Sequence, residues 1–129
     1  MEIALRAALI DWLASDPVLV SELNAIAEEA PAKGAQPWLA IATSGSVDWG
    51  TKDRAGREVR IALELHCRGD QPDTAALLIG AIEARIADMP AQQAGFRIVT
   101  SLFLRARAQQ RPANTRSILT EHRFRLLAD

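Results

Sequence analysis

The sequence predicts an α+β fold, a mainly antiparallel four-stranded sheet with two or three helices on one face. Apolar residues recur at helical spacing in residues 2–14 and 73–88. Polar and apolar residues alternate in residues 57–67, 96–107 and 116–127, as in strands with one buried face. The expected order is helix, short helix, strand, strand, helix, strand, strand, which favours two hairpins, the first with a long loop.

The composition is that of one globular domain, which we expect to span residues 1–129. Apolar residues make up 49% and charged residues 24% of the chain, which argues against a wholly disordered protein. The net charge of −1 gives no overall attraction to nucleic acid or membrane. Cys67 is the only cysteine, so an intramolecular disulfide is excluded. The sequence shows no membrane-spanning run and no signal peptide, so we expect a protein made and folded in a cytoplasm.

Charge is distributed unevenly along the chain. Residues 1–50 carry a net charge of −5, and residues 90–129 carry a net charge of +5. Two interpretations stay open. The two parts neutralise each other within one fold, or the acidic side of one subunit packs on the basic side of the next.

The N-terminal third predicts two helices followed by a loop. Residues 2–14 contain neither Gly nor Pro and carry a wide apolar stripe. Asp16 and Pro17 match an N-cap followed by proline in the first turn, which predicts a short helix over residues 17–23. Residues 24–36 contain Pro31 and Gly34 and end before Pro37, and they predict a loop.

The middle of the chain predicts two strands joined by an unusually long connection. A short apolar run covers residues 38–43, and residues 44–56 are polar and contain three glycines. In residues 57–67 one face is apolar, formed by Val59, Ile61, Leu63, Leu65 and Cys67, while the other is mostly charged. Long connections inside compact domains are usually functional or disordered, so residues 44–56 are the best candidate for contact with another molecule.

The last part predicts a helix and a second hairpin. In residues 73–88, Leu78, Ile82 and Ile86 share one face, which Leu77, Ile79 and Met89 widen. The strands 96–107 and 116–127 follow, joined by the polar turn 109–114. We expect the helices on the apolar face of the sheet and a polar opposite face carrying Glu58, Arg60, Glu64, Glu121, Arg123 and Arg125.

Catalytic patterns are weak. His66 and His122 both fall in predicted strands, and with Glu64 or Glu121 they form a conceivable metal or acid–base site. The commoner outcome for such residues is two ordinary sheet histidines. The glycines of residues 44–56 precede a strand and not a helix, so they do not form a phosphate-binding loop. We expect no enzyme, no cofactor and no metal.

Interface residues are better supported. Trp49 is a large apolar side chain in a polar segment, and Trp and Arg are enriched in interface hot spots. The alternative is that Trp49 folds back onto its own domain. Arg105, Arg107, Arg111 and Arg116 flank the second turn and could meet phosphate, although solvated arginines are the commoner outcome.

Six segments carry a resemblance to a known family. They are IALRAALIDWLASDPVL, PWLAIAT, DWGTKDRAGREVRIALELHCRG, TAALLIGAIEARIADMP, FRIVTSLFLRARAQ and RSILTEHRFRLLAD. In their order, over essentially the whole chain, the sequence resembles the small tail-terminator, or tail-completion, proteins of long-tailed phages and phage-derived gene transfer agents. The run from Asp48-Trp49 to Gly56-Arg57-Glu58 is the most specific part. Residues 24–36 depart from the family by lacking its aromatic-rich strand pattern, so no contact is assigned there.

The resemblance implies a structural virion protein that caps the tail tube as a ring, usually of six subunits. The implied partners are other copies of the chain, the tail-tube protein and the head-side connector or stopper protein, with DNA only passing through and no membrane. Assembly would occur at the head–tail junction of the particle. The implied contact residues in the first loop are Asp48, Trp49, Lys52, Asp53, Arg54 and Arg57, and Arg105, Arg107, Arg111 and Arg116 would face a channel or a neighbour.

Two other classes remain as alternatives. The first is a small cytosolic α+β adaptor that binds proteins without catalysis. The second is an enzyme built around His66 and His122.

Overall fold

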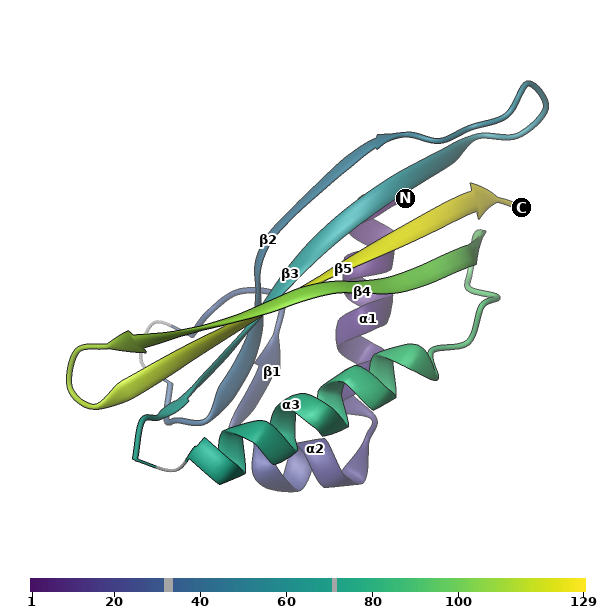
Figure 1. Cartoon of the computed structure of the whole chain (residues 1–129). Helices are drawn as coiled ribbons and strands as arrows, with labels where there is room; N and C mark the ends of the chain where they lie inside the picture. The colour runs from purple at the N-terminus through teal and green to yellow at the C-terminus, as the bar shows by residue number, and fades with distance from the viewer. Residues whose placement is uncertain (32–33, 71) are drawn as a thin grey trace.

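The computed structural model describes residues 1–31, 34–70 and 72–129 (Figure 1). Its elements, in chain order, are α1 (Glu2–Ala14), α2 (Pro17–Glu22), β1 (Ala25–Ala27), β2 (Trp38–Asp48), β3 (Gly56–Arg68), α3 (Pro72–Ala87), β4 (Phe96–Arg111) and β5 (Thr115–Ala128). The strands form one sheet in the order β1-β2-β3-β5-β4, and the helices lie on one of its faces. The predicted α+β class is confirmed, with five strands in place of four. None of the described helices is long and apolar enough to cross a membrane.

The sheet is antiparallel except at one edge, where β1 pairs in parallel with the start of β2. The two expected hairpins, β2–β3 and β4–β5, are both present. β5 joins them because it lies between β3 and β4. The strand that comes last in the sequence is therefore an interior strand of the sheet.

The predicted N-terminal helices are confirmed. α1 buries Leu5, Leu9 and Leu13 completely, which is the face that its apolar stripe predicts. Asp16 caps α2 by accepting a hydrogen bond from the backbone N–H of Val18 at 3.0 Å, and this satisfies a donor that the helix leaves free.

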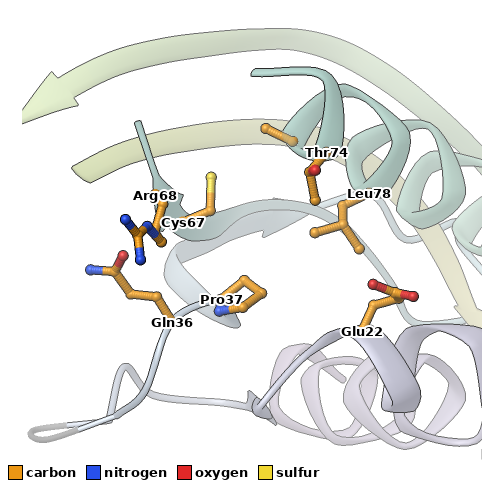
Figure 2. Close-up of a pocket in the computed structure, with 8 residues that line it drawn as sticks. Glu22, Gln36, Pro37, Cys67, Arg68, Thr74 and Leu78 are labelled. Atoms are coloured by element: carbon orange, nitrogen blue, oxygen red, sulfur yellow. The ribbon is translucent and has the colours of Figure 1, made fainter. Parts of the chain in front are cut away.

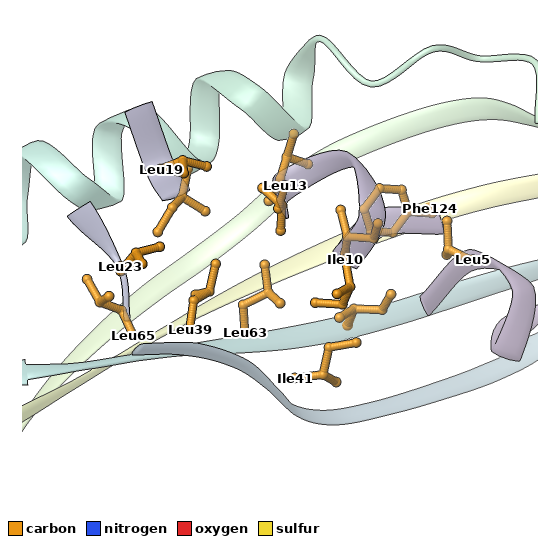
Figure 3. Packing of buried hydrophobic residues seen from close by; sticks show 14 of the residues in the cluster. Leu5, Ile10, Leu13, Leu19, Leu23, Leu39, Ile41, Leu63, Leu65 and Phe124 are labelled. Carbon is orange, nitrogen blue, oxygen red and sulfur yellow. The ribbon is translucent and has the colours of Figure 1, made fainter. Parts of the chain in front are cut away.

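The core lies between the helices and the alternating face of β3. Val59, Ile61, Leu63 and Leu65 are fully buried. Figure 3 shows leucines of α1 and α2 directed at residues of β2, β3 and β5, including Phe124. The strict alternation of β3 thus defines which face of the sheet the helices cover.

α3 buries Leu78, Ile82 and Ile86, as the helical spacing predicts. Ile79 and Met89 pack against the core from its border. The expectation for Leu77 is wrong, since its side chain is 76% exposed. Successive helical residues are turned by about 100°, which points Leu77 to solvent when Leu78 points to the sheet.

Two predictions for the first half of the chain are wrong in part. Residues 24–36, expected as a loop, contain β1 at residues 25–27; residues 28–31 and 34–36 are irregular as expected, and residues 32 and 33 lie outside the described residues. In residues 44–56, expected as one long loop, residues 44–48 and Gly56 belong to strands. β2 continues through Asp48, and only residues 49–55 connect it to β3. The polar stretch of β2 has no apolar alternation, but its backbone pairs with β3 from Thr43 to Asp48, and those ladder bonds hold it in the sheet.

The second hairpin is longer than expected. β4 extends to Arg111 and β5 begins at Thr115, so the turn contains only Pro112, Ala113 and Asn114. Ala113 and Asn114 adopt positive φ angles of 60° and 55°. This left-handed conformation is easier for asparagine than for alanine, and it lets the chain reverse within three residues.

Candidate functional site

The sheet face opposite the helices, called here the open face, concentrates arginine. Residues paired across antiparallel strands point to the same face, so the register assigns each side chain. The open face carries eight arginines and three glutamates, namely Arg60, Arg68, Arg97, Arg105, Arg107, Arg111, Arg123, Arg125, Glu58, Glu64 and Glu121. Although the net charge of the chain is only −1, positive charge is therefore concentrated on the open face.

Part of this positive charge is neutralised locally. Arg125 donates to a Glu58 oxygen at 3.0 Å, and Arg105 donates to both Glu121 oxygens at 2.8 and 3.1 Å. The hydrogen bonds from Arg105 lower the pKa of Glu121 below its ordinary value. Five positive charges remain in excess over the carboxylates of this face.

The ion pairs bear on the uneven charge distribution. Within the described ranges, none of them joins an acidic residue of 1–50 to an arginine of 90–129. Arg6 instead pairs with Glu28, Arg85 lies 4.0 Å from Asp16, and Arg105 pairs with Glu121. Direct ion pairs between the two parts are thus absent from the described residues.

The predicted contact residues of the first connection lie at the end of the β2–β3 hairpin, which projects beyond the helices (Figure 1). Lys52, Asp53 and Arg54 are exposed in the turn, and Asp48 and Arg57 are exposed where it meets the strands. Backbone hydrogen bonds hold the turn, from Trp49 to Gly56 at 3.1 Å, from Thr51 to Arg54 at 2.8 Å and from Ala128 to Ala55 at 2.9 Å. A shorter, hydrogen-bonded turn over residues 49–55, called here the β2–β3 tip, therefore replaces the expected long loop.

Trp49 is half-buried at this tip. The guanidinium carbon of Arg125 lies 5.6 Å from the centre of its ring, a cation–π distance. Arg125 is itself held by Glu58. Trp49 thus packs partly on its own chain, as the alternative interpretation expects, and it leaves part of the ring accessible.

The second predicted set lies at the other end of the sheet, in the β4–β5 hairpin (Figure 1). Arg107 and Arg111 are exposed on the open face, and Arg105 is paired with Glu121. Arg116 differs, since its side chain lies on the helix-covered face and donates to the carbonyl of Gly69 at 3.3 Å. The structure therefore does not bring the two predicted sets together in one site.

The two histidines do not form a shared site. Their strands pair, but His66 is opposite Ser117 and His122 is opposite Ile61, so the rings are five rows apart on opposite faces. His66 stacks on Trp38 with ring centres 4.9 Å apart. His122 is buried, and burial lowers its pKa to about 4. The hypothesis of a joint metal or acid–base site is wrong because of register and face.

Sequence reasoning missed a small cavity between α2, α3 and β3. Its volume is about 210 Å³, and Figure 2 shows Glu22, Cys67 and Leu78 among its walls. Burial raises the pKa of the Cys67 thiol, which keeps it a poor nucleophile at neutral pH. The walls come from separate segments of the chain, so no local pattern marks them.

Known proteins were compared with this chain. The model of the family described as "Tail completion protein gp17" matches residues 7–127. A chain in the structure "Virion of native gene transfer agent (GTA) particle" has the same fold, with a TM-score of 0.81 and 23% sequence identity, and the match covers 97% of this chain and 96% of that chain. None of the curated proteins matches.

Proposed function

The chain belongs to the tail completion protein gp17 family of phage tail structural proteins, and on that basis we propose that it caps the tail tube as a ring of six subunits. The family match over residues 7–127 carries the proposal. In this role the ring ends polymerisation of the tube and offers its far side to the head-side connector or stopper protein. The protein is made in the cytoplasm and joins the particle at the head–tail junction. DNA only passes through the ring.

The structure supports a ring through its asymmetry. A cyclic assembly needs two different surfaces of one subunit to fit each other. The sheet has two unlike edges, β1 with the end of β2 on one side and β4 on the other. The arginines of β4 lie at one edge, whereas Glu28 and Glu29 follow β1 at the other. Opposite charge at opposite edges favours a head-to-tail arrangement.

The two ends of the sheet have separate tasks in this proposal. The β2–β3 tip, with Lys52, Asp53 and Arg54, contacts the connector or the tube, together with Asp48, Trp49 and Arg57 at its base. Arg105, Arg107 and Arg111, at the far end of the open face, face a neighbour or the channel. Arg116 holds the Gly69 turn and supports that end from within. The role is structural and requires no catalysis.

Deletion of the gene in the producing cell tests the function. Negative-stain electron microscopy should then show filled heads without tails beside free tubes of uncontrolled length, and the wild-type gene supplied in trans should restore particles. Intact tailed particles of normal length would overturn the proposal. The adaptor alternative would then take its place.

A further inference from the structure

Both edges of the sheet are covered only at their beginnings. β1 pairs with Trp38–Ala40 of β2, which leaves residues 41–48 without a strand on that side in the described parts of the chain. On β4, Gln92 bridges Arg97, and the Ile98 N–H donates to the Ala91 carbonyl at 2.7 Å. Beyond that point residues 99–111 form an open edge (Figure 1). Each edge therefore offers a row of backbone groups for further pairing.

The two open stretches lie at the same level of the sheet. Rows of paired residues connect them through β3 and β5. One limiting row contains Ile41, Leu63, Thr120 and Ala106, and the other contains Asp48, Arg57, Leu126 and Ile98. The free part of β2, residues 41–48, is thus matched in position and length by residues 99–106 of β4, since the Ile98 N–H is already bonded to Ala91.

The strand directions also match. The pairs β2–β3, β3–β5 and β5–β4 are all antiparallel, so β4 runs opposite to β2. A second copy, related by rotation about an axis roughly along the strands, keeps its strand directions. Its β2 therefore arrives antiparallel to β4 of the first copy. The antiparallel order of strands therefore continues from one copy to the next.

The exposed apolar side chains point to the same edges. Eight large hydrophobic residues are exposed in the described structure, and four of them lie on the open stretches, Val47 on β2 and Val99, Leu102 and Phe103 on β4. Residues 99–104 are uncharged and contain no proline, and residues 41–48 carry only Asp48. Isolated edge strands are normally protected by lysine, proline or short length. Both stretches lack lysine and proline and are long enough to pair; the irregularities of β4, between Ile98 and Thr100 and between Phe103 and Arg105, are features that the partner strand must accommodate.

We propose that β4 of one copy pairs antiparallel with the free part of β2 of the next copy, so that the sheets join edge to edge. The proposal rests on the ring function proposed above and names the surfaces that close the ring. Backbone hydrogen bonds supply the contact, and the exposed apolar side chains of both edges cover one another. Arg107 of β4 then approaches the side of the neighbour that carries Glu29, whereas Arg105 and Glu28 are already paired within their own chains.

Disulfide trapping tests the pairing in assembled particles. In a Cys67→Ala background, we join Gly45→Cys with Leu102→Cys, two exposed open-face positions in one row. A Cβ on Gly45 meets no atom within 4 Å. Within one chain the two positions are three strand spacings apart, roughly 14 Å, which exceeds the reach of a disulfide. Any disulfide between them must therefore join two copies.

A second pair, Val47→Cys with Leu102→Cys, samples a register shifted by two residues. The control pair is Gly45→Cys with Leu77→Cys, because Leu77 is an exposed apolar residue on α3. Purified particles are oxidised and their proteins separated on a non-reducing gel. We expect a ladder of cross-linked copies for one of the two edge pairs and none for the control.

The outcomes separate the pairing from the function. If the protein is present in particles and neither edge pair cross-links, the edge pairing is wrong and the function stands. If the wild-type protein is absent from particles, both the edge pairing and the proposed ring function are wrong. If the cysteine variants do not assemble, the edge pairing is tested instead by comparing how much Leu102→Lys and Leu77→Lys protein enters particles. Both variants should remain folded, and the pairing fails if Leu102→Lys enters particles as well as Leu77→Lys does.

Discussion

Trp12 and Arg85 hold α1 and α3 together through reciprocal contacts. The indole N–H of Trp12 donates to the backbone carbonyl of Arg85 at 2.6 Å. The guanidinium of Arg85 returns two hydrogen bonds to the carbonyl of Trp12, at 3.2 and 3.1 Å, and its central carbon lies 3.4 Å from the centre of the indole ring. One pair of residues thus fixes the relative position of two helices that share few other contacts.

Arg85→Lys should therefore destabilise the fold. Lysine cannot make the paired planar hydrogen bonds or stack flat on the ring, so we expect a loss of about 1–2 kcal/mol in the free energy of unfolding. Urea denaturation measures it. Arg111→Lys, at an exposed position, is the control and should change the midpoint little. Equal effects of the two substitutions would contradict a special role for Arg85.

Gly56→Ala should destabilise the protein much more than Gly45→Ala. A Cβ on Gly56 would lie 2.7 Å from the Leu126 carbonyl oxygen and 2.8 Å from that of Trp49, and backbone must move to admit it. A Cβ on Gly45 meets nothing within 4 Å. We expect a loss of about 2 kcal/mol or more for Gly56→Ala and a change within about 0.5 kcal/mol for Gly45→Ala, by thermal or urea unfolding. Indistinguishable stabilities would show that the hairpin base relaxes freely.

His122 should make stability depend on pH. Burial lowers its pKa from 6.5 to about 4, so between these values the unfolded chain binds a proton that the folded chain does not. The free energy of unfolding then falls as the pH is lowered through this window and levels off below it. Replacing the ring by His122→Gln should reduce the loss between pH 7 and pH 5 by about 2 kcal/mol. Equal pH dependence of both proteins, measured by urea titration, would contradict a neutral buried ring.

Removing the charges at the β2–β3 tip should impair assembly without unfolding the protein. Lys52, Asp53 and Arg54 are exposed, and none of their side chains makes a hydrogen bond or ion pair with another residue that the structure describes. The triple alanine variant should keep the wild-type melting temperature within about 2 °C but should not restore particles to the deletion strain. Asp11→Ala with Asp88→Ala, also exposed, is the control and should restore them. Normal particles from the triple variant would remove these residues from the interface.

Leu102→Lys should weaken self-association of the protein in solution at high protein concentration. Leu102 is 46% exposed on the open stretch of β4, and lysine on an edge strand opposes pairing with another edge. Sedimentation at increasing protein concentration should show weaker association than for the wild type, whereas Leu77→Lys should behave as the wild type does. If Leu77→Lys weakened association and Leu102→Lys did not, the self-associating surface would lie on α3.

The elements that bury one face were predictable from the sequence. β3 could be predicted because alternate residues from Val59 to Cys67 fill the core, and burial leaves a period of two in the sequence. The end of β2 could not, because Ser44, Gly45 and Ser46 pair through the backbone at the border of the helix-covered region. Backbone pairing leaves no composition signal. β1 was missed for a different reason, since three residues are too few to show a period.

The residues of the candidate site could be predicted from the sequence, but their positions on the sheet could not. The charged turn was recognised from its composition, and the structure puts Lys52, Asp53 and Arg54 at its exposed end. The arginines were expected around the second turn, but the face of each depends on register. Two irregularities in β4, between Ile98 and Thr100 and between Phe103 and Arg105, shift the alternation that the sequence pattern assumes.

The interior position of β5, between β3 and β4, has a consequence for synthesis. β5 leaves the ribosome after the other four strands of the sheet, yet it supplies the partners of both β3 and β4, with pairs as distant as Gly56 and Leu127. Until it emerges, the β2–β3 hairpin exposes the inner edge of β3 and β4 has no partner. The nascent chain therefore passes through a stage with unpaired apolar strands, and folding waits for contacts of long sequence separation. Slow translation of the codons for β5, or shortage of a chaperone that shields such strands, should lower the yield of folded protein.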